Sequence, residues 1–139
     1  MQKPERLLVL LLRLDAVILL GALLAVFLPS RWMVEVHGWL GLGDLPGIPI
    51  VGYLTRSLAA LYALRGAVVL FLSFDVSRYA PLITFMAVTT IVFGLALVAI
   101  DVAAGMPWFW LLVEGPVIAA IWAAILWLQK EANERRGAR

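Results

Sequence analysis

The chain contains no cysteine, and charged residues make up only 14% of its 139 positions. The lack of cysteine excludes disulfides, thiolate metal sites and a cysteine nucleophile. The scarcity of charge, against about 25% in an average soluble domain, excludes an ordinary water-soluble fold. Lysine and arginine number 11 against 9 for aspartate and glutamate, an excess too small and too dispersed for a nucleic-acid surface. We therefore expect no nucleic-acid partner.

Motifs for catalysis and for cofactor binding are missing as well. The sequence has no Ser/His/Asp arrangement, no phosphate-cradling glycine loop and no metalloprotease motif. Gly41-Leu42-Gly43 is a helix stop rather than a dinucleotide fingerprint. His37 is the only histidine, and no further ligands stand at the spacing that a metal site needs. We therefore predict neither a cofactor nor a metal site, and we favour a binding or structural protein over an enzyme.

Long apolar segments dominate the sequence, because 64% of its residues are hydrophobic. A membrane-spanning helix needs about 20 mostly apolar residues. Proline marks two segment boundaries, at Pro29 after the first segment and at Pro81 in the first turn of the third. The sequence predicts an all-α integral membrane four-helix bundle, a single domain over residues 1–139, with spans at residues 7–28, 50–73, 81–101 and 107–129.

The loop between the first two spans, residues 29–49, carries an apolar stripe of its own. Its large side chains recur at the i, i+1, i+4, i+7 and i+8 spacing of one helical face: Trp32, Met33, Val36, Trp39 and Leu40. We predict a short interfacial helix over residues 31–40 that lies on the outer leaflet as a lid. An irregular loop held at the lipid headgroups by its tryptophans is the alternative.

Small residues recur at every fourth position of the fourth span, at Gly115, Ala119 and Ala123, and alanines form a similar stripe on the second. Such stripes allow helix backbones to approach each other closely. They are predicted to pack the helices of one chain together, with a homodimer interface as the alternative.

Basic residues near the span ends predict how the chain is oriented. One side carries the N-terminal basic residues, Arg78 and the basic tail over residues 130–139, whereas the other carries only Arg31. The positive-inside rule therefore places both termini in the cytoplasm. Glu131 and Arg135 are four positions apart, which predicts that the fourth helix continues into water. We expect a multi-pass protein of the cytoplasmic (inner) membrane, with membrane lipids as partners.

Six ionisable residues fall inside the predicted spans or at their rim: Arg13, Asp15, Arg56, Arg65, Asp101 and Glu114. A charge near the middle of a span costs about 3 kcal/mol, so such residues usually pair or line a cavity. Because a helix rises about 1.5 Å per residue, Asp15 and Arg65 both lie about 12 Å from the cytoplasmic end. We predict an inner polar layer, a structural ion pair between these two with Tyr62 beside it. Arg13 lies closer to the surface and is predicted to reach it as an anchor.

The remaining charges form a predicted outer polar layer. Arg56 lies about 8 Å from the outer end and Glu114 about 10 Å, with Asp101 near the rim. Tyr53 shares a helical face with Arg56. We predict that this layer binds a ligand or a proton, and that its residues are Arg56, Glu114, Asp101 and Tyr53, with His37 on the covering loop.

Glu114 is followed directly by Gly115-Pro116. Proline cannot donate to the carbonyl of Leu112, so the span is predicted to kink there and to leave an acceptor unpaired beside the carboxylate. Irregular backbone at membrane depth is tolerated where it faces protein or a cavity, which favours a pocket. The alternative is a closed ion pair between Arg56 and Glu114 that only joins two spans.

The run Tyr53-Leu54-Thr55-Arg56-Ser57-Leu58-Ala59-Ala60-Leu61-Tyr62, followed by Asp101, Gly105-Met106-Pro107 and Glu114, resembles the DoxX-like superfamily of small bacterial four-helix membrane proteins. The resemblance covers residues 50–129. It implies a left-handed four-helix bundle in the cytoplasmic membrane, in a family most of whose members have no settled activity. Sterol-isomerase and sigma-2-type proteins are more distant bundles of similar shape. The histidine and paired acids of a sterol isomerase are not evident in the spans, so that activity is not expected.

The sequence leaves three hypotheses for the function of the protein. The leading hypothesis is a non-enzymatic membrane protein that binds a lipid-like or isoprenoid small molecule in an outer-leaflet pocket. The second is a structural or accessory subunit of a larger membrane complex, with a membrane protein partner and closed intramembrane salt bridges. The third is a membrane enzyme that uses Glu114 or Asp101 as general acid or base.

Overall fold

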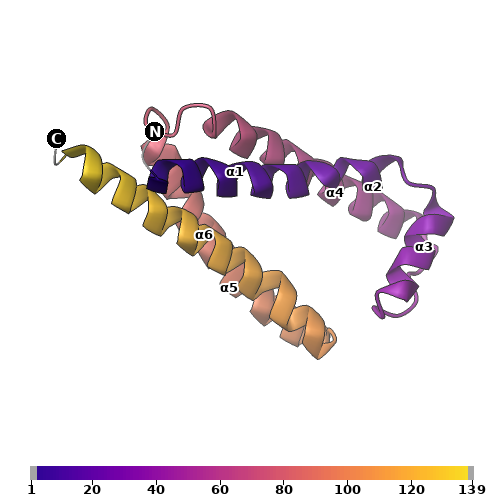
Figure 1. Cartoon of the computed structure of the whole chain (residues 1–139). Helices are drawn as coiled ribbons and strands as arrows, with labels where there is room; N and C mark the ends of the chain where they lie inside the picture. The colour runs from indigo at the N-terminus through magenta and orange to yellow at the C-terminus, as the bar shows by residue number, and fades with distance from the viewer. Residues whose placement is uncertain (1–2, 138–139) are drawn as a thin grey trace. The chain divides into compact units, whose positions relative to one another are not determined.

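The structure is a computed structural model that describes residues 3–137, apart from the side chain of Arg136, and this part of the chain is helical without strands (Figure 1). Its helices are α1 (Lys3–Gly21), α2 (Leu23–Phe27), α3 (Ser30–Trp39), α4 (Pro49–Leu72), α5 (Ala80–Ala104) and α6 (Trp108–Gly137).

Four helical segments are long and apolar enough to cross a membrane. They are Lys3–Phe27, which joins α1 and α2 across Ala22, and Pro49–Leu72, Ala80–Ala104 and Trp108–Arg135. The first span begins about a turn earlier than predicted, because Pro4 is tolerated in a first turn and Glu5 complements the helix dipole there. The predicted fold class, an all-α multi-pass membrane protein with a short helix in its first loop, is confirmed.

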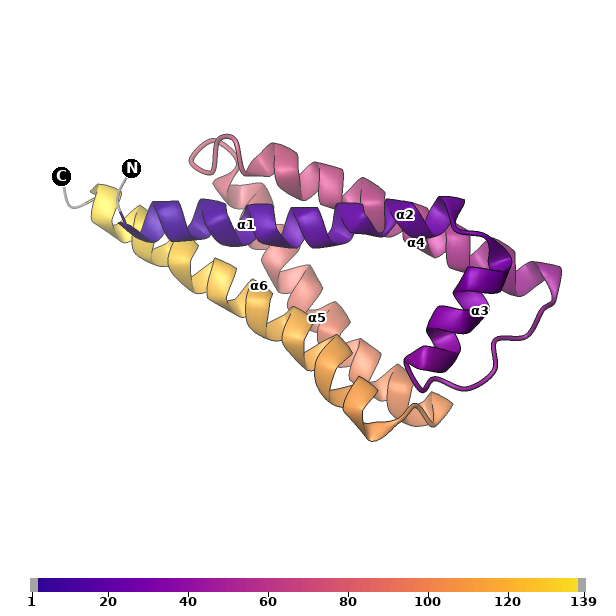
Figure 2. The same cartoon turned by 45° about the vertical axis from the view of Figure 1, so that its right-hand side comes forward.

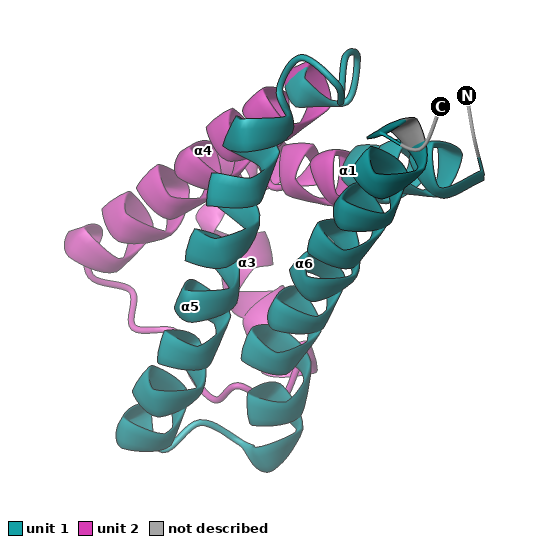
Figure 3. Cartoon of the chain, turned by 90° about the vertical axis from the view of Figure 1, so that its left-hand side faces the viewer, with its two compact units in different colours: residues 1–13, 72–139 teal, residues 14–71 magenta. Residues whose placement is uncertain are grey.

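The chain divides into two compact units (Figure 3). Unit 1 joins the chain up to Arg13 to the chain from Leu72 onward, and unit 2 is Leu14–Phe71. The assignment of the whole chain to a single domain stays a prediction.

Unit 1 is built on a helical hairpin in which α5 and α6 run side by side (Figures 1 and 2). The two helices touch backbone to backbone, because a Cβ atom added at Gly115 would collide with the carbonyl oxygen of Gly94 and lie 2.7 Å from Cγ2 of Val98. A Cβ atom added at Gly94 would lie 3.1 Å from that of Ala119. The Gly115 and Ala119 part of the predicted stripe therefore packs within the chain.

The ends of α5 follow from local sequence. Pro81 occupies its first turn, as predicted, and the preceding turn is held by the backbone N–H of Arg78, which donates to Oδ1 of Asp75 at 3.0 Å. At the other end Gly105 adopts a left-handed conformation, with φ of 68°, and its N–H donates to the carbonyl of Asp101. This cap extends α5 beyond the predicted limit at residue 101.

The predicted continuation of the fourth span is also present. α6 reaches Gly137, and Glu131 forms the expected ion pair with Arg135. Pro116 lies inside α6, which continues on both sides of it as one helix. The kink and the unpaired carbonyl of Leu112 stay predictions.

Unit 2 contains the rest of α1 together with α2, α3 and α4. A Cβ atom added at Gly66 of α4 would lie 2.9 Å from Cβ of Leu19 and 3.0 Å from the carbonyl oxygen of Ala16, so α1 and α4 meet closely there. Asp15 directly precedes Ala16 in the chain, and Arg65 directly precedes Gly66. The close approach therefore brings the part of α1 that bears Asp15 next to the part of α4 that bears Arg65.

Candidate functional site

Arg56 of α4 donates hydrogen bonds to the segment where α2 ends and α3 begins. Its Nε donates to the carbonyl of Val26 at 3.2 Å, and its Nη2 donates to the carbonyl of Leu28 at 3.1 Å and to Oγ of Ser30 at 3.4 Å. The last carbonyls of a helix have no partner within it, and proline at position 29 forces the helix to end here. Arg56 thus satisfies backbone groups that the chain break leaves exposed.

The guanidinium of Arg56 also borders a cavity of about 200 Å³ in unit 2. The third nitrogen, Nη1, donates no hydrogen bond to any residue that the structure describes, and it lies 3.2 Å from the position of a Cβ atom added at Gly52. The other lining residues are Ser30, Met33, Val34, Leu45, Pro46, Gly47, Ile48, Pro49, Val51 and Gly52. We call this cavity the Arg56 pocket; its lining is mainly apolar, contains one cation and lacks a carboxylate.

Met33 is the only residue of the apolar stripe on α3 that lines the pocket. Ser30, Met33 and Val34 line the pocket, whereas Trp39 of the stripe is 84% exposed. Met33 is the one stripe residue that is buried. The tryptophan-bearing face of α3 therefore remains exposed, as an interfacial helix requires.

The second wall of the pocket is a loop, and His37 shapes it. His37 Nδ1 donates to the carbonyl of Gly43 at 2.9 Å, since a carbonyl can only accept. Gly41 and Gly43 have φ of 71° and 86°, a region that suits glycine and lets the chain turn sharply after α3. His37 therefore positions the segment leading to Leu45, although the pocket lining does not include His37 itself.

The other predicted outer-layer residues have separate surroundings. Tyr53 is 65% exposed on α4 and does not line the Arg56 pocket. Glu114 is half-buried in α6, where its Oε2 accepts a hydrogen bond from Nε1 of Trp110 one turn earlier. Because Arg56 and Glu114 belong to different units, their predicted ion pair stays a prediction.

Asp101 is the most deeply buried of the predicted outer-layer residues, with 6% of its surface exposed. Its Oδ2 has no hydrogen-bond partner among the residues that the structure describes. The side chain also stands at the C-terminal end of α5, where the helix dipole disfavours a negative charge. A buried polar group is costly unless it is hydrogen-bonded.

The residues of the predicted inner layer all belong to unit 2. Asp15, Arg65 and Tyr62 are all half-buried in unit 2, and their ion pair stays a prediction. Arg13 is exposed; its Nε donates to Oγ of Ser73 at 3.5 Å, and its guanidinium carbon lies 5.9 Å from the ring centroid of Phe74. These contacts are to the turn after α4, at the end of the spans that we predict to be cytoplasmic.

Sequence reasoning missed the oxygen atoms that Arg56 contacts. Backbone carbonyls carry no sequence signature, and only Pro29, which marks the chain break, pointed to their position. The link between Trp110 and Glu114 could have been found from their i,i+4 spacing on one helix. No protein-family model, curated protein or solved structure matches the chain.

Proposed function

We propose that this membrane protein binds a lipid-like or isoprenoid small molecule in the Arg56 pocket. The observation that carries the proposal is a guanidinium with an uncommitted Nη1 at the edge of a mainly apolar cavity. A cation surrounded by apolar side chains suits an amphiphile, whose polar group accepts a hydrogen bond from the guanidinium while its hydrocarbon contacts the lining.

The size of the pocket limits what it holds. Sites for drug-sized ligands usually occupy about 300–1,000 Å³, and this cavity occupies about 200 Å³. It suits a headgroup or a short branch of the ligand, with the remaining hydrocarbon outside it. Val34 and Ile48, which line the pocket and are themselves exposed, provide an apolar surface for that remainder.

Filling the pocket without removing its charge is the sharpest test. We expect Gly52→Leu to reduce the recovery of the co-purified ligand at least about fivefold, because the new side chain enters the space beside Nη1 of Arg56. The measurement is mass spectrometry of lipid extracts from equal amounts of purified protein. Gly38→Leu is the control, since Gly38 is also a helical glycine of unit 2, is exposed, and its added Cβ would contact nothing within 4 Å. The proposal is wrong if both variants retain the wild-type lipid profile.

We also propose that the protein resides in the cytoplasmic membrane with both termini inside. The absence of native cysteine allows single-cysteine labelling without background substitutions. An impermeant maleimide applied to intact spheroplasts should label Asp44→Cys, in the loop after α3, and should label Asn133→Cys, in α6, only after permeabilisation. Labelling of both variants in denaturant controls for their amounts. The reverse pattern would invert the proposed orientation.

Membership of the DoxX-like superfamily is a further part of the proposal. The helix order and the four spans agree with it at the level of fold class. Arg56 on the second span and Glu114 on the last span both carry the resemblance and both belong to the predicted ligand-binding layer.

A further inference from the structure

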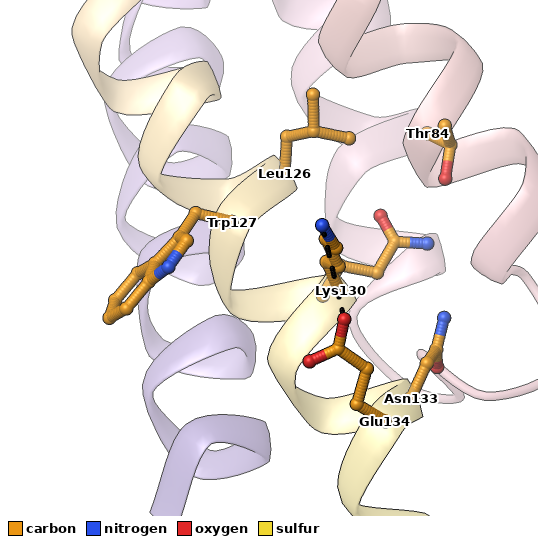
Figure 4. A pocket seen from close by; sticks show the side chains of 7 residues that line it. Thr84, Leu126, Trp127, Lys130, Asn133 and Glu134 are labelled. Atoms are coloured by element: carbon orange, nitrogen blue, oxygen red, sulfur yellow. Dashed lines mark ion pairs between the residues drawn. The ribbon is translucent and has the colours of Figure 1, made fainter. Parts of the chain in front are cut away.

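A second candidate site lies in unit 1, and its lining includes none of the residues singled out above as ligand contacts. It is a cavity of about 400 Å³ between α5 and α6, lined by Thr84, Leu126, Trp127, Gln129, Lys130, Asn133 and Glu134. Figure 4 shows Thr84 on one helix and Lys130, Asn133 and Glu134 on the other. We call it the Gln129 groove.

Gln129 lines this groove and carries a side-chain hydrogen-bond acceptor that has no partner among the described residues. Its side chain is 3% exposed, and its Nε2 donates to the carbonyl of Ala80 at the start of α5. A carbonyl can only accept, so the amide orientation is set and Oε1 must be directed elsewhere. Oε1 is buried and has no hydrogen-bond partner among the described residues. An unsatisfied buried acceptor is costly, so a donor from a bound molecule would stabilise this arrangement.

Both members of an exposed ion pair, Lys130 and Glu134, also line the groove. Nζ of Lys130 is 3.9 Å from Oε1 of Glu134, and the two side chains are 77% and 66% exposed (Figure 4). The attraction between the two charges of an exposed ion pair is weak, so each charge can also interact with a ligand. The groove therefore offers a cation for a phosphate, and an anion together with a neutral acceptor for a group that donates hydrogen bonds.

We propose that the Gln129 groove binds the headgroup of a phospholipid with a primary ammonium, of the phosphatidylethanolamine class. The ammonium donates to Oε1 of Gln129 and to the carboxylate of Glu134, and the phosphate pairs with Lys130. A choline headgroup has no N–H to donate, and a glycerol headgroup has no cation for Glu134. Trp127 and Lys130 are residue types that favour the headgroup region of a bilayer, and Leu126 adds apolar surface for the acyl chains.

The test uses a series of headgroups that differ by single methyl groups. Delipidated full-length protein in detergent is titrated, under native mass spectrometry, with phosphatidylethanolamine, its N-monomethyl and N,N-dimethyl forms, and phosphatidylcholine with identical acyl chains. Binding should weaken along the series and be about tenfold weaker for the choline lipid, the change expected from losing a hydrogen bond between charged groups. Equal binding of all four lipids would show that only water contacts Oε1 and would overturn the proposal.

Two variants locate the effect. Glu134→Gln and Gln129→Leu should each reduce the preference for ethanolamine over choline at least about threefold. Glu131→Gln is the control, because Glu131 also forms an i,i+4 ion pair on the same helix but does not line the groove. If Gln129→Leu does not fold, the methyl series and Glu134→Gln decide. A preference that survives Glu134→Gln, or that Glu131→Gln lowers equally, contradicts the proposal.

Discussion

Gly115→Leu is expected to separate α5 from α6 and to leave little folded protein in detergent. Its side chain would have to enter space occupied by the backbone of Gly94 and the side chain of Val98. Overpacking a well-packed core usually costs about 1–3 kcal/mol, and we expect at least the upper end here because a carbonyl on a helix backbone cannot move aside as a flexible side chain can. The measurement is the thermal loss of the monodisperse peak in size-exclusion chromatography.

Ala120→Leu is the control for this prediction. Ala120 lies on the same helix and is exposed, so its enlargement should change stability by no more than about 0.5 kcal/mol. Gly115→Ala should fall between the two, since even one methyl group collides with the carbonyl oxygen of Gly94. A Gly115→Leu variant that melts with the wild type would mean that α5 and α6 do not meet at these glycines.

Arg56→Ala is expected to destabilise the protein by about 2–4 kcal/mol, because it deprives the carbonyls of Val26 and Leu28 of their donor. Inside a membrane no water replaces that donor where the chain is shielded from solvent. Arg56→Lys should recover only part of the loss, since one ammonium cannot reproduce the two-nitrogen geometry of a guanidinium. Detergent melting temperatures of the three proteins measure the effect.

Arg13→Ala is the comparison for Arg56→Ala. Arg13 is exposed, and its contacts are one long hydrogen bond to Ser73 and a cation–π contact with Phe74. Such a contact at an exposed site contributes about 0.5–1 kcal/mol. Equal melting temperatures for the two alanine variants would contradict the role that we assign to Arg56.

The closed ion pair between Arg56 and Glu114, which the sequence offers as an alternative, would add a second reason for a loss, because removal of Arg56 would leave that carboxylate without its partner. This pair stays a prediction. The contacts of Arg56 within unit 2 are to neutral oxygens that precede it by 30, 28 and 26 positions. They give a reason for the loss that does not depend on Glu114, namely the chain break at Pro29.

The candidate site was only partly accessible to sequence reasoning. Depth along the spans drew attention to Arg56, which is half-buried and lines a cavity. It did not show that Val34 lines this cavity while Trp39 is exposed, because the stripe on α3 records which face is apolar and not what that face contacts. Gln129 gave no signal at all, since a single polar residue at the end of an apolar segment is common at a membrane surface.

The sequence by itself determined that this is an all-α protein with four potential spans and a short helix in its first loop. Length and hydropathy carry that information, because a helix in lipid satisfies its backbone internally and needs only about 20 apolar residues. Only the tertiary structure decided that Arg56 holds the carbonyls at the α2–α3 junction and that the amide of Gln129 directs its oxygen away from Ala80. In each contact a side chain donates to a backbone carbonyl far away in the chain. Every residue has such a carbonyl, so no local sequence pattern could specify the partner.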